Sequence, residues 1–438
     1  MNEGRICFLT KLIPTELYEN VLVKSKNNMQ DAANALQWHI YEGLYENYGD
    51  QVTIINTLPI GSFPQYYSDP FVTTSKFSTK YGNDNINLGF CNIKLIRKHS
   101  LSRKIYNALI NVFKECTNGI LYIYTISSEL MEAITKFKKV KPEIKVCAII
   151  ADLPNMSSLS TNDNVIRKIF ISYTAKKSFD SIDSIDAFAL LTKQMADYMH
   201  IDKPYCVIEG ISTATSEYES SGGMPIGNES DDLKIILYTG TLHRKFGIIQ
   251  LLEAFAMIKK NNYRLVICGA GDSEDEINKY AKMDPRIDFK GQLSRNEILK
   301  LQKQATVLVN PRQNNEEFTK YSFPSKIMEY LSSGTPVVAY KLDGVPDEYE
   351  KYLFYIENNT VEALSNKLMY VCEMDLTERV RWGEKGEKKE ILVYSNCQQA
   401  ELFVNGESQG VKMRNSQDFP GAGLRWNCAL NEGVNNIR

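Results

Sequence analysis

Short apolar runs alternate along the chain with longer stretches in which apolar residues recur every three or four positions. Runs of the first kind are typical of buried strands, and stretches of the second kind are typical of helices with one apolar face. The elements predicted for the first half are strands at residues 6–9, 52–56, 120–124, 145–150 and 187–191, and helices at residues 31–45 and 128–139. This alternation favours βα units around a mostly parallel sheet.

The same pattern returns after a polar segment. Residues 213–232 are rich in Ser, Gly, Glu and Asp, as expected for a linker or an exposed loop. The elements predicted beyond it are strands at residues 233–238, 263–268, 287–290, 306–310 and 337–340, and helices at residues 247–260, 272–283, 294–304 and 325–331. We therefore expect the fold class α/β, with two successive domains at residues 1–205 and 206–387 that face each other across a cleft.

The character of the chain changes after residue 387. Residues 391–397, 400–411 and 421–430 read as strands, and the pair Asn405-Gly406 is a strong signal for a hairpin turn. This is an antiparallel pattern attached to a helix-rich α/β protein. The third segment, 388–438, is long enough for a small sheet but too short for an independent sandwich.

Composition and charge exclude several classes of function. The formal net charge of −2 provides no overall attraction to nucleic acid or to a membrane. No run of about 18 apolar residues occurs, and the N-terminus lacks the apolar core of a signal peptide, so we expect a cytoplasmic protein. The nine cysteines and four histidines are scattered without the spacing of metal ligands. We expect reduced cysteines, no metal and no cofactor.

One stretch, residues 321–339, combines the features of an anion site. Pro324 and Ser325 are suited to begin a helix, and the backbone amides exposed there, beside Lys326, suit a diphosphate. Glu329 follows about one turn later, where it can accept hydrogen bonds from a sugar hydroxyl. An ordinary helix–strand unit explains the same pattern equally well.

Two further loops in the second half follow predicted strands. Gly240 permits a tight turn, and Arg244 with Lys245 brings positive charge that can neutralise a departing diphosphate. A solvated basic loop is the alternative explanation. The glycines of Cys268-Gly-Ala-Gly-Asp272 and the turn Lys290-Gly-Gln-Leu293 fit close packing or a contact with a nucleotide.

The first half offers fewer chemical signals. Asp152 falls at a predicted strand end, where α/β proteins place functional side chains, although a turn residue before Pro154 is an equal alternative. Two basic clusters, residues 94–104 and 136–145, can meet anionic lipid headgroups or lie on an ordinary solvated surface. Neither cluster is paired with aromatic stacking motifs for nucleic acid, so no nucleic-acid partner is expected.

Taken as a set, these motifs resemble family 4 of the retaining glycosyltransferases, which have the GT-B fold of two Rossmann-like domains. The motifs that occur in the family's order are Gly240 with Arg244 and Lys245, Gly269-Ala-Gly271, Lys290-Gly-Gln-Leu293, Asn310-Pro-Arg312 and residues 323–329. The resemblance covers residues 4–385. In the first domain, residues 58–64, 152–154 and 191–195 are similar to the family's bacterial surface-polysaccharide branch.

The resemblance implies a site and partners. Lys326 and its helix start would hold the diphosphate of a nucleotide-sugar donor, Glu329 would bind its ribose, and Arg244 or Lys245 would stabilise the leaving group. Asp152 would lie on the side of a glycan or lipid-linked acceptor, without a metal. The implied catalytic residues are Asp152, Arg244 and Lys245; the implied donor-binding residues are Gly240, Thr241, Gly269, Gln292, Leu293, Tyr321, Ser322, Phe323, Pro324, Ser325, Lys326 and Glu329.

The chain departs from the family pattern at three places. Tyr321 stands where the family often has a sugar-contacting Glu, with Glu316 and Glu317 nearby as substitutes. The first N-terminal loop, residues 10–13, lacks the usual glycine pair. Thr241 stands where an Arg is common. These departures keep open a second hypothesis, a nucleotide-sugar binding or scaffold protein of the same fold without transfer activity.

The third segment resembles something else. Residues 393–406 and 420–426 look like part of a β-sandwich module of family 2 glycoside hydrolases, without the catalytic barrel. Carbohydrate hydrolysis is not expected, because no paired-carboxylate site accompanies it. We expect a partial module or an artefact of gene fusion, and we predict that this tail does not pack firmly between the two domains.

Overall fold

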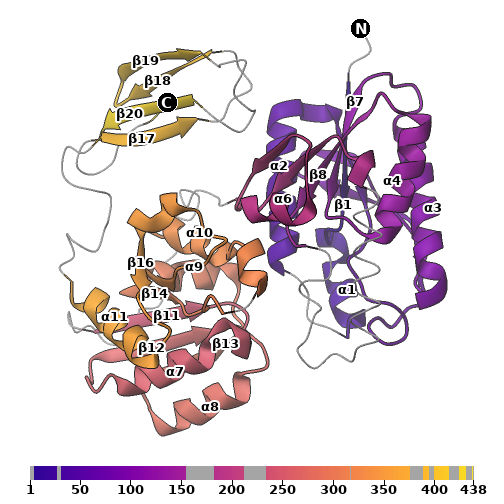
Figure 1. The fold of residues 1–438 in the computed structure, drawn as a ribbon. Coiled ribbons are helices and arrows are strands. Elements are labelled where there is room, and N and C mark those ends of the chain that lie inside the picture. The colour runs from indigo at the N-terminus through magenta and orange to yellow at the C-terminus, as the bar shows by residue number, and fades with distance from the viewer. Residues whose placement is uncertain are drawn as a thin grey trace. The chain divides into compact units, whose positions relative to one another are not determined.

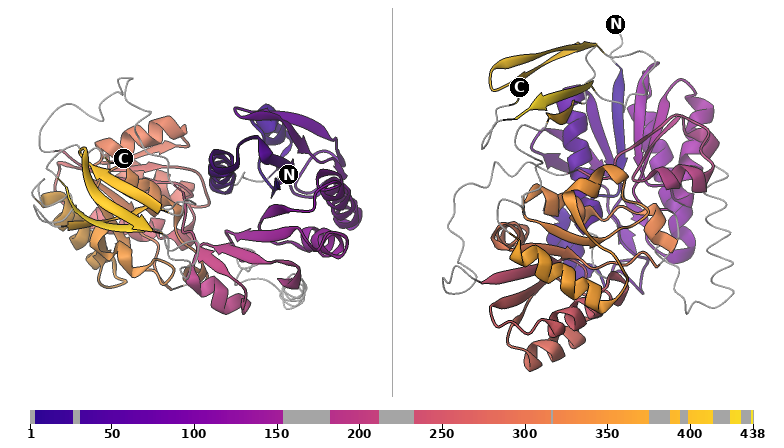
Figure 2. Two further views of the ribbon diagram at one scale, coloured as in Figure 1. Left: turned by 90° about the horizontal axis from the view of Figure 1, so that it is seen from above. Right: turned by 60° about the vertical axis from the view of Figure 1, so that its left-hand side comes forward.

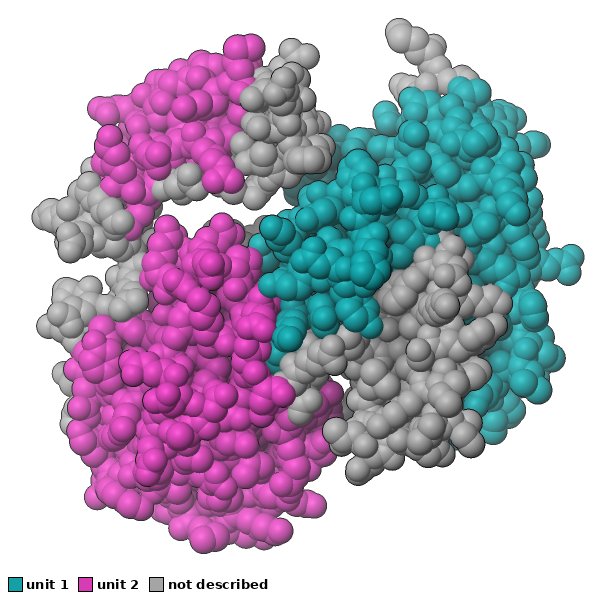
Figure 3. Space-filling model, in the orientation of Figure 1, with its two compact units in different colours: residues 1–211, 316–325 teal, residues 212–315, 326–438 magenta. Residues whose placement is uncertain are grey.

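The computed structural model describes residues 4–26, 31–153, 182–211, 233–315, 317–374, 388–393, 399–413, 424–430 and 437. The chain forms two compact units (Figure 3). Unit 1 comprises residues 1–211 and 316–325, and unit 2 comprises residues 212–315 and 326–438. The predicted linker, residues 213–232, lies outside the described residues.

Unit 1 contains an eight-stranded sheet in the order β10-β9-β8-β7-β1-β2-β5-β4. Strands β1, β7 and β8 of this sheet are labelled in Figure 1. Its strands are β1 Arg5–Thr10, β2 Val52–Asn56, β4 Ser75–Thr79, β5 Gly82–Asn87, β7 Gly119–Tyr124, β8 Lys145–Ile150, β9 Ala187–Leu190 and β10 Tyr205–Val207. All neighbours are parallel except β4, which runs antiparallel to β5. A short antiparallel pair, β3 Phe71–Val72 with β6 Phe90–Cys91, lies outside this sheet.

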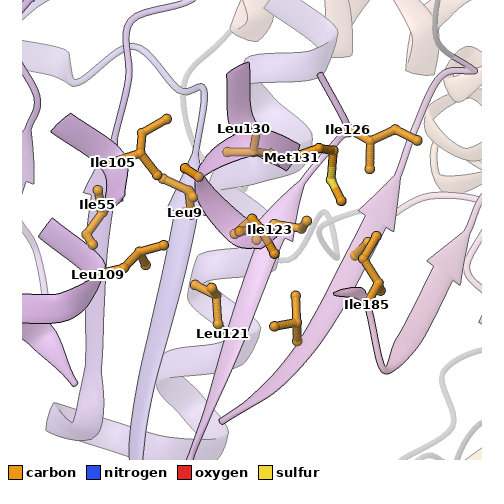
Figure 4. Packing of buried hydrophobic residues seen from close by; sticks show 14 of the residues in the cluster. Leu9, Ile55, Ile105, Leu109, Leu121, Ile123, Ile126, Leu130, Met131 and Ile185 are labelled. Carbon is orange, nitrogen blue, oxygen red and sulfur yellow. The ribbon is translucent and has the colours of Figure 1, made fainter. Parts of the chain in front are cut away.

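Helices pack on both faces of this sheet, because alternate residues of a strand point to opposite faces. The helices are α1 Tyr18–Lys24, α2 Asp31–Tyr48, α3 Lys94–Val112, α4 Ser128–Val140 and α6 Lys193–Met199. Leu9 packs with residues of α3 and α4 (Figure 4), whereas Phe8 packs in a second cluster with Tyr41 of α2. Each fully buried side chain of this size contributes about 1.5–3 kcal/mol.

Unit 2 contains a fully parallel six-stranded sheet in the order β13-β12-β11-β14-β15-β16. Its strands are β11 Lys234–Thr239, β12 Tyr263–Cys268, β13 Ile287–Gly291, β14 Val307–Asn310, β15 Val337–Tyr340 and β16 Leu353–Ile356, and its helices are α7 Ile248–Met257, α8 Glu274–Met283, α9 Arg295–Gln304, α10 Ser325–Ser332 and α11 Val361–Glu373. The chain order reverses at β11, which lies between β12 and β14, as it does at β1, which lies between β2 and β7. Ligands of such sheets bind beyond the carboxyl ends of the strands at this reversal.

The tail consists of two antiparallel pairs (Figure 2). β17 Lys388–Val393 pairs with β20 Leu424–Ala429, and β18 Gln399–Val404 pairs with β19 Glu407–Met413. The predicted hairpin at Asn405-Gly406 is confirmed: φ is 52° and 85° at these residues, as a two-residue turn between twisted strands requires. The tail has a small core of its own, which includes Trp426. Its predicted loose packing stays a prediction.

Most predicted elements are present, with shifted ends. The helix expected at residues 247–260 begins at Ile248, because Gly247 adopts a left-handed φ of 82° after the short 3-10 helix η5, Arg244–Phe246. Two long helices were not predicted, α3 and α11. The sequence of α3 begins with Lys94, Arg97 and Lys98, and its basic character concealed the apolar face formed by residues such as Leu101 and Ile105.

Two absences hold for the described part of the chain. None of its helices is long and apolar enough to cross a membrane. None of the eight cysteines in the described ranges forms a disulfide.

Candidate functional site

Three loops at the carboxyl edge of the unit 2 sheet are held against one another by their backbones. The amide of Gly240 donates to the Cys268 carbonyl at 2.9 Å, and the amide of Leu242 donates to the Ala270 carbonyl at 2.9 Å. The amide of Gly269 donates to the Gly291 carbonyl at 2.7 Å. The loops after β11, β12 and β13 therefore form one layered surface at the chain reversal of the sheet.

Glycine is required at two positions of this surface. Gly240 and Gly269 have φ of 123° and 138°, a region that side chains rarely adopt. A Cβ on Gly269 would lie 1.8 Å from the Gly240 carbonyl oxygen, and a Cβ on Gly240 would lie 2.2 Å from Cε of Lys326. The glycines thus allow the loops, and the Lys326 side chain, to approach closely.

Lys326, in the first turn of α10, lies against the aromatic ring at the end of β11. Its Nζ donates to the Tyr238 hydroxyl at 2.6 Å and lies 4.1 Å from the centre of the Tyr238 ring. Burial and the nearby Arg312 lower the pKa of Lys326 to about 7, and Glu329 partly opposes that shift. A cation in this state gains stability when an anion arrives.

Arg312 is the second cation of the site, and it was not among the predicted site residues. It follows β14, the strand beside β11 at the chain reversal, and only 8% of its surface is exposed. Its guanidinium lies 5.5 Å from the ring centre of Phe246. The signal in the sequence was its place in the motif Asn310-Pro-Arg312, directly after an apolar strand.

Glu329 is held by a residue that sequence reasoning did not identify. The buried Gln302 of α9 donates from Nε2 to Glu329 Oε1 at 2.6 Å. The backbone carbonyl of Gln302 accepts from the Thr335 hydroxyl at 2.7 Å, which anchors the end of α9. Glu329 is half-buried. Gln302 orients the carboxylate as a positioning residue.

The predicted cations Arg244 and Lys245 lie in η5, in an exposed part of the first loop. Arg244 forms an ion pair with Glu276 of α8, and its backbone amide donates to Asp272 Oδ1 at 3.0 Å. Lys245 Nζ lies 5.5 Å from the ring centre of Phe246. Arg244 and Lys245 are more exposed than Lys326 and Arg312. Their catalytic roles remain predictions.

Three further predicted donor-binding residues lie on loops of unit 2. Thr241 and Gln292 are exposed, and Leu293 is half-buried, on the loops that follow β11 and β13. Gly291 has a φ of 65° and begins the second of these turns. Ser294 then caps α9 by accepting a hydrogen bond from the Glu297 amide. The turn is therefore well defined, and its contact with a base stays a prediction.

Residues 321–325 pack with unit 1. The Tyr321 ring lies against the unit 1 core, 4.9 Å from the ring of Tyr198 in α6. Phe323 and Pro324 are buried, Ser322 is half-buried, and Ser325 is exposed as the first residue of α10. Tyr321 thus has a packing role, and its contact with the donor sugar stays a prediction. Glu316 and the side chain of Glu317 lie outside the described residues.

The loop after β1 in unit 1 is filled by side-chain amides. The amide of Lys11 donates to Gln37 Oε1 at 2.7 Å, that of Leu12 to Asn56 Oδ1 at 2.9 Å, and that of Ile13 to Asn34 Oδ1 at 2.7 Å. Three successive backbone donors are therefore satisfied within the protein. This loop, which lacks the expected glycine pair, therefore has no unsatisfied backbone amide at these three positions.

A charged group lies beside this loop at the carboxyl edge of the unit 1 sheet. Lys11 Nζ lies 3.6 Å from Glu129 Oε1 and donates to the Ser127 hydroxyl at 3.3 Å. Asp152, after β8, is exposed at the same edge and helps to raise the pKa of the buried Tyr124, although burial has the larger effect. Its role toward an acceptor stays a prediction.

The second basic cluster of the sequence is used inside unit 1. Lys138 donates to the Ile144 carbonyl and to Asp186 Oδ2, at 2.9 and 2.8 Å, and only 16% of its side chain is exposed. Lys141 donates to the Cys116 carbonyl at 3.1 Å. These two lysines bind the ends of neighbouring segments, whereas Lys136, Lys139 and Lys145 of the same cluster are exposed, as expected for a solvated surface. A contact of this cluster with lipid stays a prediction.

Comparisons with known proteins bear on the fold and on unit 2. Residues 224–389 match the family model described as Glycosyl transferases group 1. An E. coli trehalose-6-phosphate structure bound with UDP-2-fluoro glucose is similar with a TM-score of 0.58, at 10% identity over 86% of this chain and 93% of that chain. Sucrose-phosphate synthase from Thermosynechococcus elongatus is similar with a TM-score of 0.56, at 15% identity over 86% and 92%.

A third similar structure is Anabaena HepE in complex with UDP, with a TM-score of 0.51 at 12% identity over 86% of this chain and 92% of that chain. These likenesses concern the fold. They confirm the expected fold class, α/β with two Rossmann-like domains of the GT-B type. The short antiparallel β tail of that expectation is present in the strand pairing of the chain itself.

The tail has its own relatives. Residues 386–437 match a model described as a domain of unknown function (DUF4982). A putative beta-glucuronidase from Formosa agariphila is 51% identical over 57 residues, which are 13% of this chain and 7% of that protein. This short match agrees with the expected resemblance to a glycoside hydrolase module.

The arrangement in unit 2 can hold an anion and, beside it, can accept hydrogen bonds from the hydroxyls of a sugar ring. Lys326 and Arg312 supply positive charge, and Glu329 supplies a fixed acceptor about one helical turn from Lys326. Within the described residues no group of three or more His, Cys, Asp or Glu side chains is placed to hold a metal ion.

Proposed function

We propose that the chain is a retaining glycosyltransferase that moves a sugar from a nucleoside diphosphate sugar to a polysaccharide or lipid-linked glycan. The observation that carries the proposal is the pair Lys326 and Arg312 at the chain reversal of the unit 2 sheet, with Glu329 fixed by Gln302 beside them. The match of residues 224–389 to Glycosyl transferases group 1 supports it.

In this proposal unit 2 binds the donor. Lys326 and the amides at the start of α10 bind the diphosphate, and Glu329 accepts hydrogen bonds from the ribose hydroxyls. The acceptor hydroxyl attacks the anomeric carbon on the face from which the diphosphate departs. The hydroxyl proton passes to the departing phosphate, and the new glycosidic bond forms as the bond to that phosphate breaks.

The leaving diphosphate gains negative charge as its bond to the sugar breaks. Lys326 and Arg312 are placed to stabilise that charge, and Arg244 and Lys245 add to it from the neighbouring exposed loop. Cations that are already desolvated act more strongly here than solvated ones, because little solvent reorganises during the reaction. Metal-independent transfer follows as part of the proposal.

Unit 1 handles the acceptor in this proposal. The amides of residues 11–13 are occupied by side chains, so this loop contributes Lys11 rather than backbone donors. Lys11 and Asp152 lie at the carboxyl edge of the unit 1 sheet, where they can bind sugar hydroxyls. A lipid-linked acceptor would bring unit 1 into peripheral contact with a membrane.

Isothermal titration of the full chain with UDP, GDP and their sugars tests the proposal. We expect one nucleoside diphosphate to bind. Lys326→Met should weaken that binding at least about a hundredfold, since the diphosphate loses both a charge-assisted hydrogen bond and a neighbouring positive charge. Lys303→Ala, an exposed lysine of α9, is the matched control and should bind as the wild type does. Absence of binding by every donor would refute the proposal.

A binding or scaffold protein without transfer activity is the second candidate. The packing of Tyr321 against Tyr198 favours it, because that residue is then not free to replace a sugar-contacting Glu. Donor hydrolysis or sugar transfer, followed by mass spectrometry and abolished by Lys326→Met and Glu329→Ala, would exclude it. Binding with no turnover across a donor and acceptor screen would establish it.

A further inference from the structure

Unit 1 exposes large apolar side chains at one edge. The side chains are those of Leu22 and Val23 in α1, Tyr66, Phe71 in β3, and Leu95 and Ile96 in α3; we call them the apolar rim. Leu95, Val23 and Phe71 are 88%, 82% and 63% exposed. Soluble proteins seldom gather exposed apolar residues in this way without a binding role.

The three segments that carry the apolar rim are fastened to one another. The amide of Lys26 donates to the Tyr66 carbonyl at 3.0 Å, which joins the end of α1 to the second segment. The amide of Asn92 donates to the Pro70 carbonyl at 2.7 Å, and β3 pairs with β6 just before α3 begins. The three segments that carry the rim are therefore neighbours within unit 1.

The apolar rim lies at the functional edge of unit 1. α1 follows β1, and α3 precedes the parallel strand β7, so α1 and the first turn of α3 both lie at the carboxyl edge of the sheet, at the same end of unit 1 in Figure 1. Lys11 and Asp152 lie at the same edge. A surface bound to the rim would therefore lie near any acceptor held there.

Basic residues accompany the apolar rim. Lys26 and Lys94 are exposed, and Lys98 is half-buried in the first turns of α3, near Glu132. Residues 18–26, 66–71 and 93–98 contain five basic and two acidic residues, in a chain whose formal net charge is −2. One of the basic residues, Lys24, is paired with the acidic Asp69 at 2.8 Å. The edge is thus locally positive.

This combination identifies the partner by its chemistry. Lysine is depleted in the cores of protein–protein interfaces, whereas a lysine beside exposed aliphatic and aromatic side chains suits a lipid surface, with its stem among the acyl chains and its ammonium at the headgroups. Anionic headgroups add an electrostatic attraction that depends on salt.

We propose that the apolar rim docks unit 1 onto an anionic membrane surface and presents a lipid-linked acceptor to the carboxyl edge of its sheet. The second part rests on the proposed transferase function, and the docking itself does not. Docking places Leu95, Val23 and Phe71 in the interface between headgroups and acyl chains, with Lys26 and Lys94 at the level of the phosphates.

Sedimentation of the full chain with lipid vesicles tests this proposal. We expect binding to phosphatidylcholine vesicles that contain phosphatidylglycerol, much weaker binding to phosphatidylcholine alone, and a loss of binding as salt is raised. The double variant Val23→Glu, Leu95→Glu should lower the vesicle partition coefficient at least about tenfold. The control is Met257→Glu, Met283→Glu, which changes two exposed apolar residues of unit 2 in the same way and should bind as the wild type does.

The outcomes separate this proposal from the proposed function. Urea unfolding followed by circular dichroism shows whether unit 1 of the rim variant is folded, and UDP or GDP titration of the same preparations reports separately on the proposed donor site in unit 2. If the wild-type chain does not bind anionic vesicles, or if the rim variant binds them as the wild type does, the docking proposal alone is overturned. Self-association that the rim variant abolishes, without vesicle binding, assigns the rim to a second copy and also overturns it. Vesicle binding without donor binding refutes the transferase alone.

Discussion

The loops after β1 in unit 1 and β11 in unit 2 occupy equivalent places in their sheets, yet they are completed differently. In unit 1, the side chains of Gln37, Asn56 and Asn34 accept hydrogen bonds from the backbone amides of residues 11–13. In unit 2, the Gly240 loop rests on the backbone of the Gly269 loop, and the neighbouring charges are Lys326 and Arg312.

The difference shows how one topology supports two tasks. Uncharged amides satisfy a buried loop without needing a ligand, whereas two desolvated cations are costly until an anion arrives. The position in unit 2 is therefore suited to a diphosphate, and the position in unit 1 is suited to a neutral group or a sugar hydroxyl. The contrast supports the proposal that the donor binds to unit 2 and the acceptor to unit 1.

The largest expected effect concerns the backbone contact in unit 2. Gly269→Ala should destabilise unit 2 by about 3 kcal/mol, because the methyl group meets the Gly240 carbonyl oxygen and the left-handed φ is unfavourable. Urea unfolding followed by circular dichroism measures the loss.

Gly43→Ala in α2 of unit 1 is the control for that experiment. A Cβ added to Gly43 would meet nothing within 4 Å, so alanine should stabilise the helix by roughly 0.5–1 kcal/mol. Equal effects of the two substitutions would show that the Gly240 and Gly269 loops of unit 2 are not in close contact.

A smaller effect is expected for the carboxylate of the donor site. Glu329→Gln should weaken binding of the nucleoside diphosphate about tenfold, because the ribose hydroxyls lose a charged acceptor while the side chain keeps its size. Glu253→Gln, an exposed glutamate of α7, should leave the dissociation constant unchanged. Titration calorimetry that finds the same affinity in both variants would remove Glu329 from the donor site.

The smallest effect tests the unit 1 side of the contrast. Gln37→Leu removes the hydrogen bonds to the amide and the carbonyl of Lys11 and should cost about 1 kcal/mol of stability. Donor affinity should not change, since the proposed donor site lies in unit 2. A gain in donor affinity would mean that the freed amide binds the diphosphate, and the division of labour between the units would be wrong.

The fold was largely predictable from the sequence. Strand and helix positions follow from local periodicity, so β11, β12 and the hairpin at Asn405-Gly406 were found within a few residues. Helix α3 was missed, because charge near Lys94 concealed a helix whose apolar face begins at Leu101. Element type is a local property, and here local signals were sufficient in most places.

The site was less predictable, because its decisive contacts join distant residues. Gln302 reaches Glu329 across 27 positions, and Gln37 reaches Lys11 across 26. No spacing rule connects such pairs. Arg312 had a visible signal after β14, but its burial beside Lys326 depends on the packing of three separate loops. Only the folded chain shows which polar residues converge.

The central claim, that Lys326 binds the donor diphosphate, is tested most directly by the pH dependence of that binding. The ligand-free pKa of Lys326 is lowered to about 7, so above this pH the free protein must take up a proton when the anion binds. Between pH 8 and 9 the nucleotide phosphate, with its pKa near 6, is fully ionised, and affinity should fall about tenfold per pH unit. We predict this slope, with proton uptake, for the wild type and a flat profile for Lys326→Met. The same slope in both proteins, or no proton uptake in the wild type, would contradict the account.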